Sequence, residues 1–148
     1  MDTITIRNAR TEDLPAILSI EKDSFVSPWS EDTFDSVFQD SRCKGFVAYQ
    51  GDILTGYCFA FEMKNMIHLL NLAVRSEYRR NGIGKALLEE IEVLSRQSDR
   101  QGIILEVRIG NQVAKSFYQT MGFTHVSTWK EYYTDTLEDA LVMAKKTG

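Results

Sequence analysis

Two glycines, Gly82 and Gly84, stand between an apolar segment and an amphipathic one, and this arrangement restricts the possible folds more than any other feature of the chain. Residues 67–74, IHLLNLAV, are apolar almost throughout and predict a strand that is buried on both faces. The apolar side chains after the glycines recur at helical spacing, as at Leu87 and Ile91, and predict a helix. The glycines are therefore expected at the start of a helix that closely follows a strand.

Glycine at a helix start exposes backbone N–H groups, and the helix dipole there favours a negative charge. The side chains around the two glycines are also positive: Arg75, Arg79, Arg80 and Lys85. The stretch therefore predicts a backbone cradle for an anion. Solvated arginines beside a helix entry softened by glycine are the alternative interpretation of the same residues.

Two familiar nucleotide-binding motifs do not fit this stretch. A dinucleotide-binding fingerprint needs a glycine or alanine three residues after Gly84, where the chain has Leu87. A P-loop needs serine or threonine after its Gly-Lys pair, whereas Ala86 follows Lys85 here. The sequence therefore excludes both motifs, but the exposed N–H groups and the positive side chains still predict an anion site.

Hydrophobic periodicity along the chain predicts the order of its helices and strands. Strand patterns cover residues 3–7, 45–49, 53–63, 67–74, 102–107, 123–129 and 139–145. Helices are expected from Thr11 to Phe25, from Ser30 to Phe38, after Gly84, and from Asn111 to Met121. The segment 130–138, KEYYTDTLE, is expected as a loop. The order β-α-α-β-β-β-α-β-α-β-β predicts an α/β (α+β) fold with one mixed sheet and helices on both faces.

The composition fits one globular domain, residues 1–148, whose core needs neither disulfides nor metal. Hydrophobic residues make up 43% of the chain and charged residues 26%, which argues against disorder. The net charge of −4 argues against direct nucleic-acid binding, which needs a basic face. Cys43 and Cys58 are too few for a disulfide framework or a zinc site. No membrane span or signal peptide is recognisable, so a cytoplasmic location is expected.

Two segments of the chain resemble motifs of the GNAT acetyltransferases. LLNLAVRSEYRRNGIGKALL resembles the family's central motif, in which a strand leads into R/Q-x-x-G-x-G/A and the glycine stretch binds the pyrophosphate of acetyl-coenzyme A. LEVRIGNQVAKSFYQTMGF is similar to the family's next strand and helix. The resemblance extends over nearly the whole chain. It implies the GNAT fold, with a single mixed, mostly antiparallel and twisted sheet, acetyl-coenzyme A as co-substrate, and no metal.

The resemblance also implies which residues bind the coenzyme and carry the chemistry. The expected coenzyme contacts are Leu72, Ala73, Val74, Arg79, Arg80, Asn81, Gly82, Ile83, Gly84, Lys85, Asn111 and Tyr118. Glu106 is implied as the general base for the amine, and Tyr118 as the general acid for the departing thiolate. The residues alone leave other interpretations open, with Glu106 as a surface partner of Arg108 and Tyr118 as a core aromatic. No nucleophile motif is present, so we expect direct attack by the amine on the thioester.

The resemblance is greatest to the branch of the family that acetylates protein N-termini, which includes the enzymes that modify the N-terminal alanine of a small-subunit ribosomal protein. It implies four peptide-binding residues: Pro28, Trp29, Tyr132 and Tyr133. The expected partner is a protein or peptide N-terminus, with a ribosomal protein as the first candidate. No direct contact with nucleic acid or membrane is expected, and the chain is expected to be a monomer or weak dimer.

Two departures from this branch leave the acceptor open. Met66 and His68 fall where its members often carry acidic residues. His68 could relay a proton, although a half-buried strand histidine that is satisfied by a neighbour is the commoner case. The alternative functions are a GNAT enzyme that acts on a small amine, such as a polyamine, amino acid or aminoglycoside, and a sensor that binds acetyl-coenzyme A without turnover.

Overall fold

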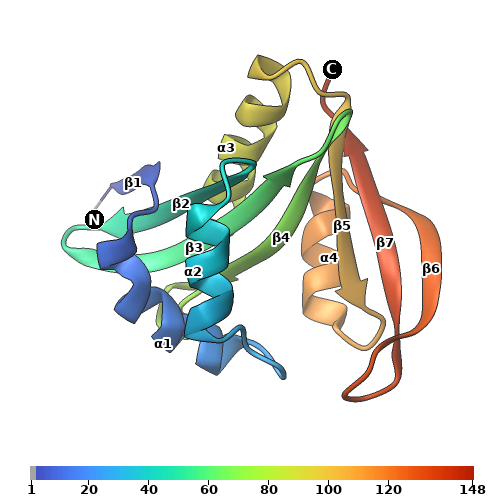
Figure 1. Cartoon of the computed structure of the whole chain (residues 1–148), viewed down its shortest axis with the longest axis horizontal. Helices are drawn as coiled ribbons and strands as arrows, with labels where there is room; N and C mark the ends of the chain where they lie inside the picture. The colour runs from blue at the N-terminus through green and yellow to red at the C-terminus, as the bar shows by residue number, and fades with distance from the viewer. Residues whose placement is uncertain (1–2) are drawn as a thin grey trace.

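The computed structural model describes residues 3–148 and contains a seven-stranded sheet with the strand order β1-β2-β3-β4-β5-β7-β6 (Figure 1). The strands are β1 (Ile4–Asn8), β2 (Cys43–Gln50), β3 (Ile53–Glu62), β4 (Met66–Val74), β5 (Gly102–Arg108), β6 (Thr124–Tyr133) and β7 (Glu138–Lys146). The helices are α1 (Leu14–Ser24), α2 (Glu31–Gln39), α3 (Ile83–Gln97) and α4 (Gln112–Thr120), with short 3-10 turns η1 (Thr11–Asp13) and η2 (Ser76–Tyr78). All neighbouring strands are antiparallel except β4 and β5, which are parallel. The expected mixed, mostly antiparallel sheet is confirmed.

Helices cover both faces of the sheet, as the element order predicts (Figure 1). On one face, α1 and α2 bury Ile17 and Phe34 against Tyr57 and Phe59 of β3. On the other face, α3 and α4 pack a second cluster of buried side chains against the sheet, which includes Leu87, Leu88, Ile91, Cys58, Ile103 and Tyr118. Each helix therefore has one apolar stripe turned toward the sheet, which is what its periodicity predicted.

Local capping explains where two of the helices begin. The Ser30 hydroxyl accepts a hydrogen bond from the Thr33 N–H at 3.2 Å, and the Asn111 side chain accepts one from the Ala114 N–H at 3.1 Å. The expectation that Thr11 caps the first helix is wrong, because α1 starts at Leu14 after a 3-10 turn. Within that turn, the Asp13 carboxylate accepts from the Arg10 N–H at 2.8 Å.

Two strand predictions also need correction. Strand β6 continues through Tyr133, so the expected loop at 130–138 shrinks to residues 134–137. Strand β4 is not buried on both faces, because Ile67, Leu69 and Ala73 are buried while the side chains between them are only half-buried. The reason is tertiary: part of β4 borders a cavity instead of another strand.

The parallel pair of β4 and β5 is short, and this positions the site. It joins Met66, Ile67 and His68 to Gly102, Ile103 and Ile104, and no pairing of these two strands follows. Beyond that point β4 stays paired with β3, and β5 with β7, so the sheet opens between its two halves (Figure 1). The main-chain groups on the facing edges of the opening are left for another partner.

Two negative findings apply to the described residues, 3–148. None of their helices combines the length and the apolar character that crossing a membrane requires. No three histidine, cysteine, aspartate or glutamate side chains gather among them in a way that could hold a metal ion. Cys43 and Cys58 are both free thiols in this part of the chain, and burial raises the pKa of each.

Candidate active site

A cavity of about 880 Å³ lies where β4 and β5 separate. Its walls are residues 69–74 of β4, residues 105–108 of β5, the start of α3, one side of α4, and the end of α1 with the segment that follows it. The cavity therefore joins the two motifs that the sequence analysis identified separately. They meet because the strands that precede them are neighbours in the sheet.

The end of the cavity at α3 has the properties of an anion site. Gly82 has a φ of 82°, in the left-handed region that favours glycine, and a Cβ added there would meet nothing within 4 Å. No side chain caps α3, and the first N–H groups of a helix have no acceptor within it. The side chains of Arg79, Arg80 and Lys85 line this end of the cavity. Exposed N–H groups, the helix dipole and these cations all favour a bound anion.

The cavity brings together most of the residues that the sequence analysis singled out. Those that line it are Trp29, Leu72, Ala73, Val74, Arg79, Arg80, Gly82, Ile83, Gly84, Lys85, Glu106, Asn111, Tyr118 and Tyr133. Three expected residues do not line it: Pro28, Asn81 and Tyr132. Tyr132 instead packs between Trp129 and Tyr133, with ring centroids 5.2 and 5.1 Å away, and is 47% exposed.

Glu106 projects into the cavity from the middle of β5 and is bonded to His68 of β4. The distance between His68 Nε2 and Glu106 Oε2 is 2.6 Å, and the glutamate side chain is 13% exposed. The alternative interpretation, in which Glu106 pairs with Arg108, does not describe this structure, because Arg108 bonds other carboxylates. A partly buried carboxylate with an imidazole on one oxygen is chemically suited to accept a proton and pass it on.

Tyr118 lies where α4 meets the cavity. It packs edge-on between Phe117 and Phe123, so it is part of the core as well as of the cavity wall. Burial raises the pKa of the Tyr118 phenol, so the hydroxyl keeps its proton. Among the described residues its hydroxyl has no hydrogen-bond partner, which leaves the O–H group available to a ligand in the cavity.

A buried carboxylate that the sequence analysis missed, Glu21 of α1, forms part of the opposite wall. It is 1% exposed and accepts three hydrogen bonds, from the Tyr57 hydroxyl at 2.5 Å, the Asn71 side-chain amide at 3.0 Å and the main-chain N–H of Trp29 at 2.9 Å. These bonds tie α1, the segment before α2, and strands β3 and β4 to one point. The spacing could have indicated its burial, because Glu21 stands four residues after Ile17, on the apolar face of α1.

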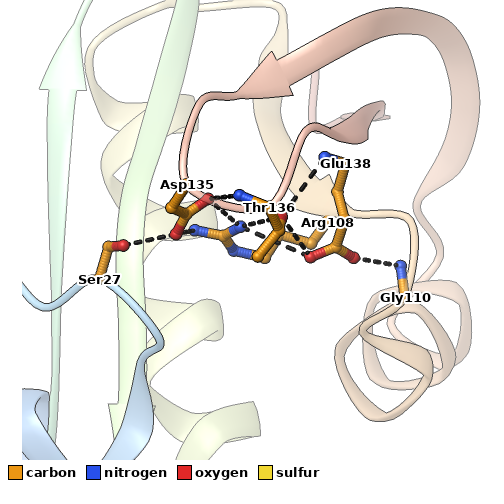
Figure 2. A network of polar contacts seen from close by, with 6 residues as sticks. All are labelled: Ser27, Arg108, Gly110, Asp135, Thr136 and Glu138. Carbon is orange, nitrogen blue, oxygen red and sulfur yellow. Dashed lines mark hydrogen bonds and ion pairs between the residues drawn. The ribbon is translucent and has the colours of Figure 1, made fainter.

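A second polar network lies beside the cavity, which Ser27 and Arg108 help to line, and Figure 2 shows its contacts. The Arg108 guanidinium donates to both Asp135 oxygens at 2.8 Å and lies 3.6 Å from a Glu138 oxygen. The Ser27 hydroxyl donates to Asp135 at 2.5 Å, which joins the α1–α2 segment to the β6–β7 loop. The guanidinium also lies 4.1 Å from the centroid of the Tyr133 ring. We call the contact among Ser27, Arg108 and Asp135 the clasp.

Two side chains in this region, Asp135 of the clasp and the neighbouring Tyr133, have shifted pKa values. Hydrogen bonds from Arg108 and Ser27 hold the pKa of Asp135 well below its usual range. Burial, together with the nearby Glu106 carboxylate, raises the pKa of Tyr133 to about 12. At neutral pH Asp135 is therefore charged and Tyr133 is a neutral hydrogen-bond donor. No sequence pattern connects Arg108 to Asp135, so the clasp is a feature of the tertiary structure alone.

Comparisons with known proteins show the family and the fold. The model of the acetyltransferase (GNAT) family matches residues 14–123. Ribosomal protein bS18-alanine N-acetyltransferase of Escherichia coli strain K12 is 36% identical over 145 residues, which cover 95% of each chain. The crystal structure of the ribosomal-protein-S18-alanine N-acetyltransferase from Escherichia coli has a TM-score of 0.89 at 34% identity, and the match covers 99% of this chain and 95% of that one. Arabidopsis thaliana NAA60 in complex with acetyl-CoA shares the fold, with a TM-score of 0.88, 21% identity, and coverage of 97% and 98%.

The buried Glu21 gives a testable pH dependence. Burial raises its pKa above the ordinary value and outweighs the opposing effect of its three donors. The folded protein therefore holds this proton more tightly than the unfolded chain. The resulting stability is fully present below the ordinary glutamate pKa and is lost as the pH rises through the raised pKa. We expect Glu21→Gln to flatten this descent in the unfolding free energy.

The measurement is chemical denaturation of both proteins at a series of pH values between about 4 and 8. Glu89→Gln, at an exposed position on α3, is the matched control and should keep the wild-type slope. If the Glu21→Gln profile runs parallel to that of the wild type, the carboxylate does not hold its proton more tightly in the folded state.

Proposed function

This chain belongs to the GNAT acetyltransferase family and is an acetyl-coenzyme A-dependent N-acetyltransferase, and from that premise we propose that it acetylates the N-terminal α-amine of a protein. The first candidate acceptor is the N-terminal alanine of ribosomal protein bS18, because the Escherichia coli relative at 36% identity is named for that reaction. The structural feature that supports an amine acceptor is the Glu106–His68 pair in the cavity wall.

The residues present fit acetyl-coenzyme A. A diphosphate would lie at the start of α3, where Gly82 leaves open space for it and Arg79, Arg80 and Lys85 supply positive charge. We assign the pantetheine arm and the acetyl carbonyl to the main chain of residues 72–74, on the side where β4 has lost β5 as its partner. When bound, the coenzyme supplies an activated acetyl thioester.

Each proton of the transfer has a group to receive or supply it. The amine nitrogen attacks the carbonyl carbon, so that the C–N bond forms and the C–S bond breaks. Glu106 accepts the proton that the nitrogen loses, directly or through water, and His68 on its other oxygen offers that proton a route to solvent. Tyr118 donates a proton to the leaving sulfur, since its hydroxyl lines the cavity with its proton retained.

An α-amine suits this base better than a lysine side chain does. An α-amino group has an ordinary pKa of about 8 and lysine about 10.4, so the neutral α-amine costs about 3 kcal/mol less to form at neutral pH. A single glutamate with one imidazole is therefore an adequate base for the first amine.

The state of the carboxylates argues against a polyamine acceptor. A polyamine site needs several carboxylates that are available to cations. Glu21 is already satisfied by three donors, and Asp135 is bound by Arg108 and Ser27. A sensor without turnover would have no use for the Glu106–His68 pair beside an available tyrosine hydroxyl.

The first test is thiol release from acetyl-coenzyme A with a panel of acceptors. The panel contains peptides that begin with Ala-Arg, Ser, Met or an acidic residue, a lysine peptide with a blocked N-terminus, and spermidine. We expect turnover with free peptide N-termini and the highest kcat/KM for alanine. Turnover with spermidine or the blocked lysine peptide alone would overturn the acceptor class, and tight coenzyme binding without any turnover would favour the sensor.

Glu106→Gln tests the general base. The amide keeps the shape of the side chain but cannot accept the proton, so we expect kcat to fall by about 100-fold or more. The dissociation constant of acetyl-coenzyme A, measured by calorimetry, should stay within about twofold of the wild-type value, because the anion end of the cavity is intact. A kcat that equals that of the wild type would remove Glu106 from the mechanism.

Tyr118→Phe separates chemistry from packing at the same position. Only the hydroxyl is lost, and the ring still fills its place between Phe117 and Phe123. We expect kcat to fall by about 10-fold or more while the melting temperature changes little. A lower melting temperature with normal turnover would mean that the tyrosine serves the core alone.

A further inference from the structure

A register shift in β4 turns Asn71 toward the acceptor side of the cavity. In the pairing with β3, Leu69 lies opposite Ala60 and Asn71 opposite Phe59, so Leu70 is an extra residue. His68 and Asn71 therefore point to the same face of the sheet, although they are three positions apart. That face also carries Glu106, which bonds His68, and it is the face that α1 covers.

Glu21 determines which way the Asn71 amide points. The Asn71 Nδ2 group donates to Glu21 Oε1 at 3.0 Å. A carboxylate accepts hydrogen bonds only, so turning the amide over would place two acceptors against each other. The carbonyl oxygen of Asn71 is thus fixed on the side away from Glu21.

That carbonyl oxygen is buried and has no hydrogen-bond partner. Among residues 3–148, Asn71 Oδ1 is the one buried side-chain nitrogen or oxygen in this state. A buried acceptor without a partner destabilises the folded state, and folded proteins seldom retain such a group without a use for it. Because Asn71 lines the cavity, a donor on a bound substrate is the partner that would satisfy it.

We propose that the Asn71 carbonyl oxygen accepts a hydrogen bond from the α-amine of the acceptor, and that Glu21 is the positioning residue that aims it. The inference rests on the proposed function and names a further substrate-binding residue for it. A neutral α-amine has two N–H groups and one lone pair. With one N–H held by Asn71, the lone pair is directed at the acetyl carbonyl and the proton released on attack remains close to Glu106.

The position of Asn71 favours the acceptor over the coenzyme as the source of the donor. The neighbouring side chain, Leu72, packs with the cluster beneath α3, on the side of the sheet that carries the anion site. Asn71 faces the opposite way, toward α1 and Trp29, whose N–H shares the Glu21 carboxylate with the Asn71 amide. The amide is therefore part of the wall that we assign to the peptide.

The test compares the wild type with Asn71→Leu, which is close in size but has no polar atoms, and with Asn71→Ala as the second variant. The same peptide beginning with alanine is used throughout, and acetyl-coenzyme A binding is measured separately without peptide. We expect kcat/KM for the peptide to fall by about 10-fold or more in both variants, which corresponds to about 1.4 kcal/mol. The dissociation constant of acetyl-coenzyme A should stay within about twofold of the wild type.

Two further variants make the result specific. Asn65→Ala, at an exposed position in the β3–β4 turn, should keep wild-type kinetics. Glu21→Gln replaces the carboxylate with a group that can donate as well as accept, so the orientation of the Asn71 amide is no longer fixed. The KM for the peptide should therefore rise more than kcat falls. An unchanged KM for Glu21→Gln would remove its positioning role.

The outcomes distinguish this inference from the function on which it rests. If the wild type acetylates the peptide and both Asn71 variants match it, the oxygen does not contact the acceptor and the inference is overturned. If coenzyme binding weakens as much as peptide turnover, the donor belongs to the coenzyme and the inference is also overturned. If the wild type acetylates no peptide N-terminus, the proposed function itself has failed.

Discussion

The short parallel pairing of β4 with β5 is the constraint on which the rest of the structure depends. Because the two strands share only three residue pairs, the sheet opens beyond His68 and Ile104, and a cavity of about 880 Å³ occupies the opening. A continuous sheet would satisfy its own main chain and leave no room for a ligand. In the open sheet, the edge of β4 and the start of α3 both present backbone groups to the same space. A continuous sheet would have paired the groups on the edge of β4, and we assign the coenzyme to these groups and to those at the start of α3.

Three carboxylates around this opening differ because their partners differ. Glu21 is buried with three neutral donors, so burial dominates and raises its pKa. Asp135 accepts hydrogen bonds from a guanidinium and a hydroxyl, which lower its pKa. Glu106 has one imidazole and an otherwise open cavity, which leaves it as the carboxylate that is suited to proton transfer. The same functional group thus joins elements of the cavity wall at Glu21, links two segments at Asp135 and is the proposed base at Glu106.

The two sides of the cavity are divided by charge as well as by shape. Arginine and lysine side chains and the N-terminus of α3 make one end positive, where a diphosphate fits. The other end contains Glu21, Glu106 and the clasp. The positive charge of the Arg108 guanidinium in the clasp is balanced by Asp135 and Glu138. We therefore propose that an anionic coenzyme and an amine acceptor bind at opposite ends, so that the thioester and the amine meet beside Glu106 and Tyr118.

The sequence by itself determined the element order, the helix entry at Gly82 and the two motifs, because each depends on residues close together in the chain. Periodicity predicted every strand and long helix, and glycine beside arginine is a local pattern that indicates an anion site. Only the tertiary structure decided which residues meet across the opening. The His68–Glu106 pair spans 38 positions, the Glu21–Asn71 bond spans 50, and the Ser27–Asp135 bond spans 108. No local pattern records such contacts, since they follow from strand register, from the extra residue in β4 and from the docking of α1.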